Sequence, residues 1–307
     1  MRNKILKSAF LFIFFITRIT SFSQVSWGEP EEYKLGLSEQ AYEKLKKGTV
    51  YFVIPDYMME DKDEFVQAVK QNWTFSEIEI IGLDDYPTYA GRDDAIFLTF
   101  EASFFEGKTF ESARFKMWCK KVKKDKLHNI EDDYYGGFSL ILEKESYDLV
   151  TSMRMKPAMK LFTEGGVKFV NFKPGIVASY LRVIQYGLEN RLKYEDVKKS
   201  TTIKNLIEDT LYITDDLINT HKLTEEEFAA IYPYPYKFVT IDEMNYMLLT
   251  NRKFFYYISV SHDIQFVNNK TGELICPSLY PNNLKEFKIL LKHNVKVIKR
   301  VEKTGKQ

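Results

Sequence analysis

Residues 45–55 read LKKGTVYFVIP, and this stretch decides the fold. Its centre, Val50 to Ile54, is an uninterrupted apolar run of β-branched and aromatic residues between Gly48 and Pro55. A short apolar run with turn residues at both ends is typical of a buried strand. The pattern therefore predicts a buried strand around which the first half of the chain is built.

A second copy of this pattern lies 161 residues further along, where Leu45, Thr49 and Tyr51 recur as Leu206, Thr210 and Tyr212. Further pairs follow in the same order: Glu64-Phe65 with Glu227-Phe228, Leu83-Asp84-Asp85 with Ile241-Asp242-Glu243, Phe97 with Phe255, and Cys119 with Cys276. The shared order predicts an internal duplication. The alternative is chance similarity between two ordinary α/β segments.

The predicted fold class is α/β, with two tandem halves that each have the order β-α-β-α-β-β. In the first half we expect strands at 50–54, 77–83, 95–102, 114–122 and 138–142, and a helix at 61–73. In the second half we expect strands at 211–213, 238–241, 254–260, 265–267 and 273–276, a helix that Thr224 begins through a capping box, and a helix that Asp242 caps and that runs to Leu249. Helical crossovers join parallel strands, so we expect the first strands of each sheet to be mainly parallel. The last strands of each half should form an antiparallel hairpin at the edge of the sheet.

A long amphipathic helix is predicted between the halves. Pro174 stands at its first turn, where a missing N–H costs nothing. One apolar stripe follows at helical spacing: Val177, Leu181, Ile184, Leu188 and Leu192, widened by Tyr180 and Tyr186. We expect this helix to pack across both halves.

The predicted organisation of the chain has five parts. They are a signal peptide at 1–23, a first half at 24–170, a connecting helix and linker at 171–200, a second half at 201–295 with a helix at 283–292, and a disordered basic tail at 296–307.

The first 23 residues have the order of a secretory signal peptide. Arg2, Lys4 and Lys7 precede the apolar run AFLFIFFI at 9–16, and Ser21-Phe22-Ser23 places small residues at the −3 and −1 positions before Gln24. The apolar run is too short to span a membrane as a helix. We therefore expect cleavage after Ser23, no transmembrane segment in the mature chain, and a periplasmic or secreted location.

Charge and cysteine content exclude several classes of protein. Removing residues 1–23 takes four basic residues and no acid, so the net charge falls from +1 to −3. This near balance argues against a nucleic-acid partner.

The two cysteines, Cys119 and Cys276, do not form a disulfide scaffold or a CxxC motif. We expect two separate, mostly buried thiols, and the alternative is one bridge between them.

No catalytic or cofactor-binding motif stands out in the sequence. The histidines never form a two-histidine metal motif, there is no G-x-S-x-G elbow, and no acidic cluster has the spacing of a calcium loop. His262 follows a predicted strand and is the first candidate for a dispersed catalytic group, with Asp84 and Asp242 as candidate carboxylates. A structural histidine and solvated or helix-capping acids are the simpler interpretation. We expect neither a cofactor nor a metal.

Aromatic residues favour a binding protein over an enzyme. Tyr134-Tyr135 and the segment YPYPY at 232–236 are candidates for exposed rings that contact an envelope protein or a glycan, although such rings are usually buried. The favoured hypothesis is a non-catalytic binding module that uses a sheet edge or an aromatic surface. The alternative is a periplasmic hydrolase with dispersed catalytic residues.

Several segments together resemble a group of exported proteins of Bacteroidota-type bacteria without an assigned activity. They are the SFSQ cleavage region, L-x-x-x-T-x-Y, TEEEF at 224–228, YPYPYKFV at 232–239, the acidic helix start that follows and NNKTGEL at 268–274. The likeness covers most of the chain and is clearest from Leu206 to Cys276. These motifs belong to strands, caps and turns, so the resemblance implies export across an inner membrane and no chemistry.

Export gives the first prediction. Protein recovered from the envelope fraction of the producing cell should begin at Gln24, or at its cyclised form, when its N-terminus is sequenced. An intact Met1 in a soluble cytoplasmic fraction would rule the signal peptide out.

Overall fold

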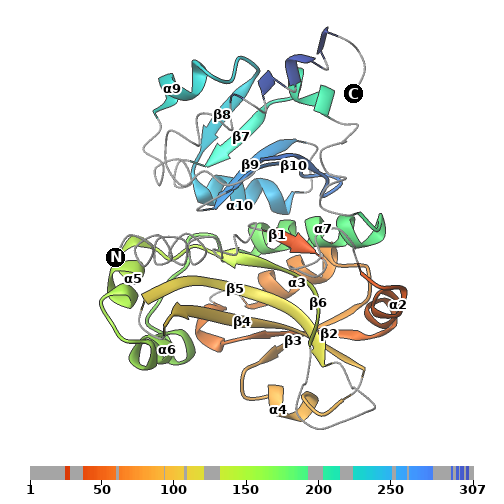
Figure 1. The fold of residues 1–307 in the computed structure, drawn as a ribbon, viewed down its shortest axis with the longest axis vertical. Coiled ribbons are helices and arrows are strands. Elements are labelled where there is room, and N and C mark those ends of the chain that lie inside the picture. The colour runs from red at the N-terminus through yellow and green to blue at the C-terminus, as the bar shows by residue number, and fades with distance from the viewer. Residues whose placement is uncertain are drawn as a thin grey trace, which may run out of the picture.

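The computed structural model describes residues 25–27, 37–59, 62–92, 94–106, 109–120, 132–192, 203–214, 224–250, 254–260, 263–278 and parts of 292–303. These residues form two β-sheets with the helix α7 (Pro174–Glu189) between them (Figure 1). The predicted signal peptide, its cleavage site and almost all of the helix expected at 283–292 lie outside the described residues.

The first sheet has six strands in the order β1-β6-β5-β4-β2-β3. They are β1 (Val25–Trp27), β2 (Thr49–Ile54), β3 (Glu77–Gly82), β4 (Ala95–Phe105), β5 (Thr109–Lys120) and β6 (Asp132–Leu140). The strand β2 runs parallel to both β3 and β4, and the remaining neighbours are antiparallel. The sequence thus predicted correctly that the first strands of this sheet are parallel and that its later strands are antiparallel.

Both faces of this sheet are covered beside β2, which explains why its sequence is apolar without a break. Val50, Phe52 and Ile54 join the main core, whereas Tyr51 and Val53 face the opposite way into a smaller cluster. Successive side chains of a strand point to opposite faces, so a strand that is covered on both sides needs apolar residues at every position.

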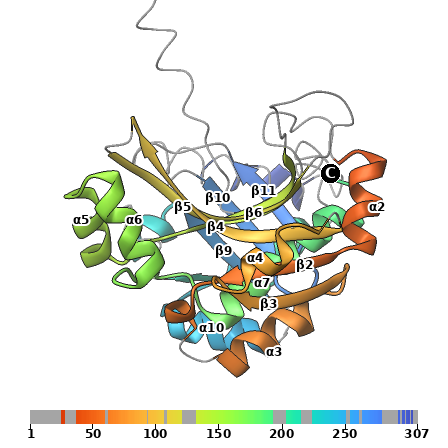
Figure 2. The same cartoon turned by 90° about the horizontal axis from the view of Figure 1, so that it is seen from below.

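The helices of the first half are divided between these two faces. They are α2 (Glu39–Lys47), α3 (Lys62–Asn72), α4 (Tyr86–Tyr89), α5 (Lys144–Thr151), α6 (Met155–Glu164) and α7, with the 3-10 turn η2 at Asp56–Met58. The helices α2, α3 and α7 contribute to the main core, and α4 covers the opposite face. Viewed from below, α4 lies in front of the sheet (Figure 2).

The second half has a five-stranded sheet in the order β11-β10-β9-β7-β8. Its strands are β7 (Leu211–Thr214), β8 (Tyr236–Val239), β9 (Phe255–Val260), β10 (Asp263–Asn268) and β11 (Leu274–Ser278). Its helical elements are η4 (Ile203–Ile207), α9 (Glu225–Ala229) and α10 (Ile241–Leu249). As with β2, the first strand β7 runs parallel to its two neighbours, and the later strands are antiparallel.

The two sheets therefore share one strand order and one pattern of parallel and antiparallel pairs, apart from β1. Leu45 and Leu206, which begin the repeated pattern, are both fully buried just before the first parallel strand of their sheet. The first half has two strands more than the predicted β-α-β-α-β-β, and the second half has one more. The topology agrees with a duplication, and the duplication itself stays a prediction.

One proposed pair of the duplication does not fit the strand order. Cys119 lies on β5, but Cys276 lies on β11, whose counterpart in the first sheet is β6. Cys119 is a free, buried thiol whose sulfur lies 3.1 Å from the hydroxyl of Tyr135. The side chain of Cys276 lies outside the described residues.

The structure corrects the predicted start of α10. Thr240, and not Asp242, is the N-cap: its hydroxyl accepts the N–H of Glu243 at 3.2 Å, and the Glu243 carboxylate accepts the N–H of Thr240 at 2.8 Å. The hydrogen bond from this N–H is the main reason that the pKa of Glu243 lies below its usual value. Asp242 sits in the first turn, where a negative charge favours the helix dipole.

The C-terminal segment also differs from the disordered tail expected at 296–307. Described residues of this segment are helical, and Ile298 is fully buried with Val295 in the outer core of the second half. The hydroxyl of Tyr234 donates to the carboxylate of Glu302 at 3.1 Å. Val295 and Ile298 are three residues apart, so they lie on the same face of a helix. Burial of this face stabilises the segment although lysines surround it in the sequence.

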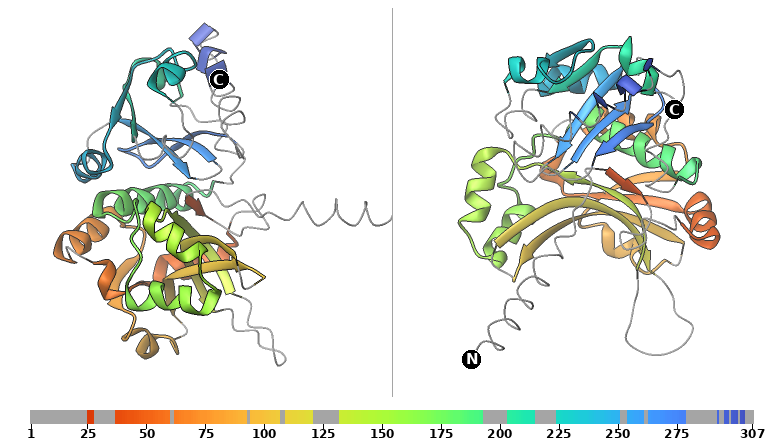
Figure 3. Two further views of the ribbon diagram at one scale, coloured as in Figure 1. Left: turned by 90° about the vertical axis from the view of Figure 1, so that its left-hand side faces the viewer. Right: turned by 45° about the horizontal axis from the view of Figure 1, so that its top comes forward.

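The helix α7 is buried on almost every side, not along one stripe. Twelve of its sixteen residues are buried, including Ser179 and Arg182. It packs against α3 of the first half and α10 of the second, as expected, and the main core runs from Phe52 on β2 through Leu181 to Leu248 on α10. The left view of Figure 3 shows the helix as a layer between the two sheets.

Two glycines allow the second half to approach α7 closely. A Cβ on Gly175, at the start of α7, would lie 2.2 Å from the carbonyl oxygen of Asn245 on α10. Gly272, in the β10–β11 turn, has a φ of +76°, and its Cβ would lie 2.4 Å from the carbonyl oxygen of Arg182. Both contacts are with backbone atoms, so no rotamer change can relieve them.

The second prediction concerns this close approach. Gly175→Ala should lower the free energy of unfolding by about 2–3 kcal/mol, because the added methyl group must push α7 and α10 apart. The matched control is Gly91→Ala, where a Cβ meets no atom within 4 Å; it should change the value by less than about 0.5 kcal/mol. Urea unfolding of both variants measures the difference, and equal stabilities would contradict the packing described.

Candidate functional site

The structure does not bring the candidate carboxylates together. Asp84 is exposed in the turn before α4, and Asp242 is exposed on α10. In Figure 1, α4 lies below the first sheet and α10 lies above it. Asp242 instead forms an ion pair with Lys173, with 2.9 Å between the carboxylate oxygen and Nζ. His262 lies outside the described residues, as do His128, His221 and His293.

The tyrosines proposed as exposed rings are mostly buried. Tyr134, Tyr135 and Tyr232 have at most 4% of their surface exposed, so they pack inside the protein and cannot form a contact surface. Tyr234 and Tyr236 are half-buried beside Tyr232. The simpler interpretation, that these rings pack against the sheets, is therefore correct for the three buried residues.

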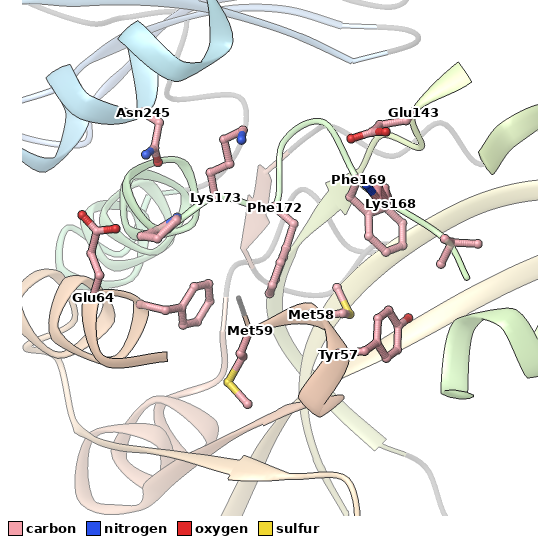
Figure 4. Close-up of a pocket in the computed structure, with 13 residues that line it drawn as sticks. Tyr57, Met58, Met59, Glu64, Glu143, Lys168, Phe169, Phe172, Lys173 and Asn245 are labelled. Carbon is pink, nitrogen blue, oxygen red and sulfur yellow. The ribbon is translucent and has the colours of Figure 1, made fainter. Parts of the chain in front are cut away.

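A cavity of about 330 Å³ lies where the two halves meet (Figure 4). Tyr57, Met58 and Met59, which follow β2 after Pro55 and Asp56, form part of its floor. The start of α3, the segment 167–174 and Asn245 on α10 also line the cavity. A volume of this size is at the small end of the range for small-molecule sites.

The position of the cavity follows from the topology of the first sheet. The strand β2 lies between β3 and β4, and the crossovers α3 and α4 leave on opposite faces. Loops at the carboxyl end of such a central strand diverge and leave a crevice, which is where ligands bind in open α/β sheets. The turn after β2 forms this crevice, and α7 and α10 close it from above.

Asn171 holds one wall of the cavity in place. Its buried side chain accepts the N–H of Ile141 at 2.8 Å and donates to the carbonyl of Ser139 and the hydroxyl of Tyr180, both at 3.0 Å. These bonds fasten the segment 167–174 to the end of β6 and to α7. The N–H of Glu143 donates to the carbonyl of Lys168 at 2.9 Å, so these two residues lie side by side.

Aromatic rings and methionines form the floor of the cavity. The rings of Phe65 and Phe172 stack with centroids 5.2 Å apart, and Phe169 lies beyond them. Tyr57 completes the floor, and its hydroxyl donates to the carbonyl of Phe162 at 2.6 Å. Burial raises the pKa of Tyr57 to about 12, so its ring remains neutral at physiological pH.

Charged and amide groups surround this apolar floor. Glu64 on α3, Glu143, Lys168 and Lys173 contribute the charges. Asn245 adds an amide whose oxygen accepts the N–H of Gly175 at 2.8 Å. The amide oxygen is therefore occupied, while its NH₂ group has no hydrogen-bond acceptor among the residues that the structure describes.

The side chains that line the cavity are aromatic, aliphatic, charged and amide groups. Among the described residues that line the cavity there is no serine, threonine, cysteine or histidine to serve as a nucleophile or as a base that titrates near neutral pH. The described parts of the chain also contain no group of three His, Cys, Asp or Glu side chains that could hold a metal ion.

The sequence did not predict this site. Its residues come from separated segments, and no two of its charged groups form a recognisable motif. A weak signal was present, because Tyr57-Met58-Met59 is an apolar run just after a central strand and Phe172-Lys173-Pro174 precedes the longest helix.

Comparison with known proteins adds no relative: no family model matches the chain, and no curated protein or solved structure was found to match it. In the part of the chain that is described, every helix is too short or too polar to cross a membrane.

The third prediction tests the floor of the cavity through Tyr57. Tyr57→Phe should lower the free energy of unfolding by about 1 kcal/mol, because the carbonyl of Phe162 loses its donor. The folded-state pKa is raised, so this stabilisation is present below pH 10 and is lost as the pH rises towards 12. The difference between wild type and variant should therefore shrink over that interval.

Tyr246→Phe is the matched control, because this side chain is 71% exposed on α10. Its free energy of unfolding should stay within about 0.5 kcal/mol of wild type. Urea unfolding at several pH values measures both variants, and a Tyr57→Phe difference that does not change above pH 10 would contradict the assignment.

Proposed function

We propose that this chain is an exported envelope protein that binds a small, partly apolar molecule in the cavity beside α7 and does not transform it chemically. The observation that carries the proposal is the cavity itself, which combines an aromatic floor with charged groups at the point where both halves meet. Small-molecule sites often lie at such junctions, where a few polar groups converge on apolar side chains.

The rigidity of the surroundings supports a binding role. The floor residue Phe65 is 3% exposed and belongs to the main core, and Asn171 fixes the opposite wall through three hydrogen bonds. A preformed cavity loses little conformational entropy when a ligand enters, which favours affinity.

Export is the second part of the proposal, and the order of residues 1–23 supports it. The first described strand, Val25–Trp27, begins two residues after the predicted cleavage site and pairs with β6 at the edge of the first sheet. The predicted mature N-terminus would thus enter the sheet almost at once, and the folded part would not require the signal peptide.

The fourth prediction tests the cavity with a variant that fills it. The mature protein, incubated with the low-mass fraction of an envelope extract, should show a bound adduct at one per chain by native mass spectrometry. Met58→Trp places an indole on the floor of the cavity and should remove at least nine-tenths of this adduct, while the circular dichroism spectrum stays unchanged.

The matched control is Leu149→Trp, because this side chain is 38% exposed on α5 and does not line the cavity. It should retain the adduct in full. The proposed function is wrong if wild type shows no adduct or if Met58→Trp retains it.

A further inference from the structure

Asn245 is the residue through which the second half reaches the cavity. Among the described residues that line the cavity, it alone belongs to the second half, and the others lie between Tyr57 and Pro174. Its side-chain oxygen accepts the N–H of Gly175 at 2.8 Å. Because a backbone N–H can only donate, this bond fixes which end of the amide is the oxygen and which is the NH₂ group. Figure 4 shows the amide pointing from α10 towards α7.

The NH₂ group of Asn245 is a half-buried donor that no described residue uses. The other neutral side-chain donor of the described lining, the hydroxyl of Tyr57, already donates to the carbonyl of Phe162 at 2.6 Å. Solvent can accept the hydrogens of the amide, but a ligand that covers Asn245 displaces this solvent. Such a ligand must supply an acceptor, because a covered donor without one weakens binding.

The charged groups of the lining select neither an anion nor a cation. Lys173 is paired with Asp242 at 2.9 Å. Glu64 and Lys168 are exposed, and Glu143 is half-buried beside Lys168. The lining thus has charges of both signs that stay largely in water, where ionic contacts contribute little to binding. The amide of Asn245 is therefore the polar group that decides what lies on the apolar floor.

We propose that the cavity binds a neutral apolar molecule that carries a carbonyl group, such as a ketone, an ester or an amide. The inference rests on the proposed function and names its ligand class. The carbonyl oxygen accepts a hydrogen bond from the NH₂ group of Asn245, and the apolar part of the ligand covers Phe172, Met58 and Met59. The ligand thus contacts both halves of the protein.

Hydrogen-bonding capacity favours a carbonyl over other groups. A hydrocarbon would leave the amide donor of Asn245 unsatisfied, and an ammonium group has no lone pair with which to accept. A hydroxyl could accept the bond, but it brings a donor that needs a partner of its own. A carboxylate could also accept, yet it would lose much of its hydration beside an apolar floor, and one neutral amide returns less than this loss.

Four compounds of similar shape test the inference by ligand-observed NMR titration of the mature chain. Acetophenone carries the carbonyl, and α-methylstyrene has a methylene group in place of its oxygen. Benzoate and α-methylbenzylamine supply the anion and the cation, and each should bind more weakly than acetophenone. The ratio of the ketone affinity to the alkene affinity is the main readout, because comparing this ratio between variants cancels the difference in hydrophobicity of the two compounds.

Two variants assign the carbonyl to Asn245. Asn245→Asp keeps an oxygen that can accept the N–H of Gly175 but removes the NH₂ group, and Asn245→Leu removes both. In each variant the ketone-to-alkene ratio should fall at least about fivefold, the effect of one neutral hydrogen bond. Asn190→Asp makes the same chemical change at the exposed C-cap of α7 and should leave the ratio unchanged. A merely structural role of Asn245 would weaken both compounds alike and would not change the ratio.

The possible failures can be told apart. An equal ratio in wild type and both Asn245 variants would overturn the assignment of the carbonyl to this residue. Benzoate or α-methylbenzylamine binding as tightly as acetophenone would overturn the neutral class. If none of the four compounds binds while the adduct of the envelope extract persists and Met58→Trp removes it, the carbonyl class is wrong and the proposed function stands.

Discussion

The structure depends on the burial of one helix between two sheets. α7 can be buried on almost all sides only because two points of close approach admit the second half: Gly175 against the backbone of Asn245, and Gly272 against the backbone of Arg182. Arg182 is held in this interface, where its guanidinium donates to Asn269 at 2.5 Å and to the carbonyl of Leu248 at 3.4 Å. A charged group buried in this way requires its partners, so the second half is tied to a defined position on the helix.

The same constraint creates the cavity. The crevice at the end of β2 belongs to the first sheet, but Asn245 on α10 closes it, and the start of α7 forms part of its wall. Lys173, the residue before α7, is paired across the junction with Asp242. The pairing of this lysine at the rim of the cavity is therefore a consequence of how the halves are joined. A shift of α10 would change both the shape of the cavity and the pairing of its charges.

Much of the fold could be predicted from the sequence, because its elements follow local patterns. The run Val50–Ile54, the Thr224 capping box, the strands expected at 265–267 and 273–276 and the helix that begins at Pro174 all lie where local signals placed them, to within a few residues. The full burial of α7 was not predicted, since Ser179 and Arg182 lie on the side that the pattern showed as polar and only a second layer covers them. The cavity was missed for the same reason. The residues that line it come from five separated segments. Contacts across the junction, such as that of Lys173 with Asp242, join residues far apart in the chain and so produce no recognisable spacing in the sequence.

The measurement that tests the central claim most directly is native-state hydrogen exchange on the mature chain. If both sheets and α7 form one cooperative unit, the amides of Leu181 and Val183 should exchange only by global unfolding. Their exchange free energies should then equal those of Phe52 on β2 and Val267 on β10 within about 0.5 kcal/mol. A clearly lower value for Val267 than for Phe52, with Leu181 following only one of them, would mean that the halves unfold separately. In that case α7 would be a connector and not the shared core of the protein.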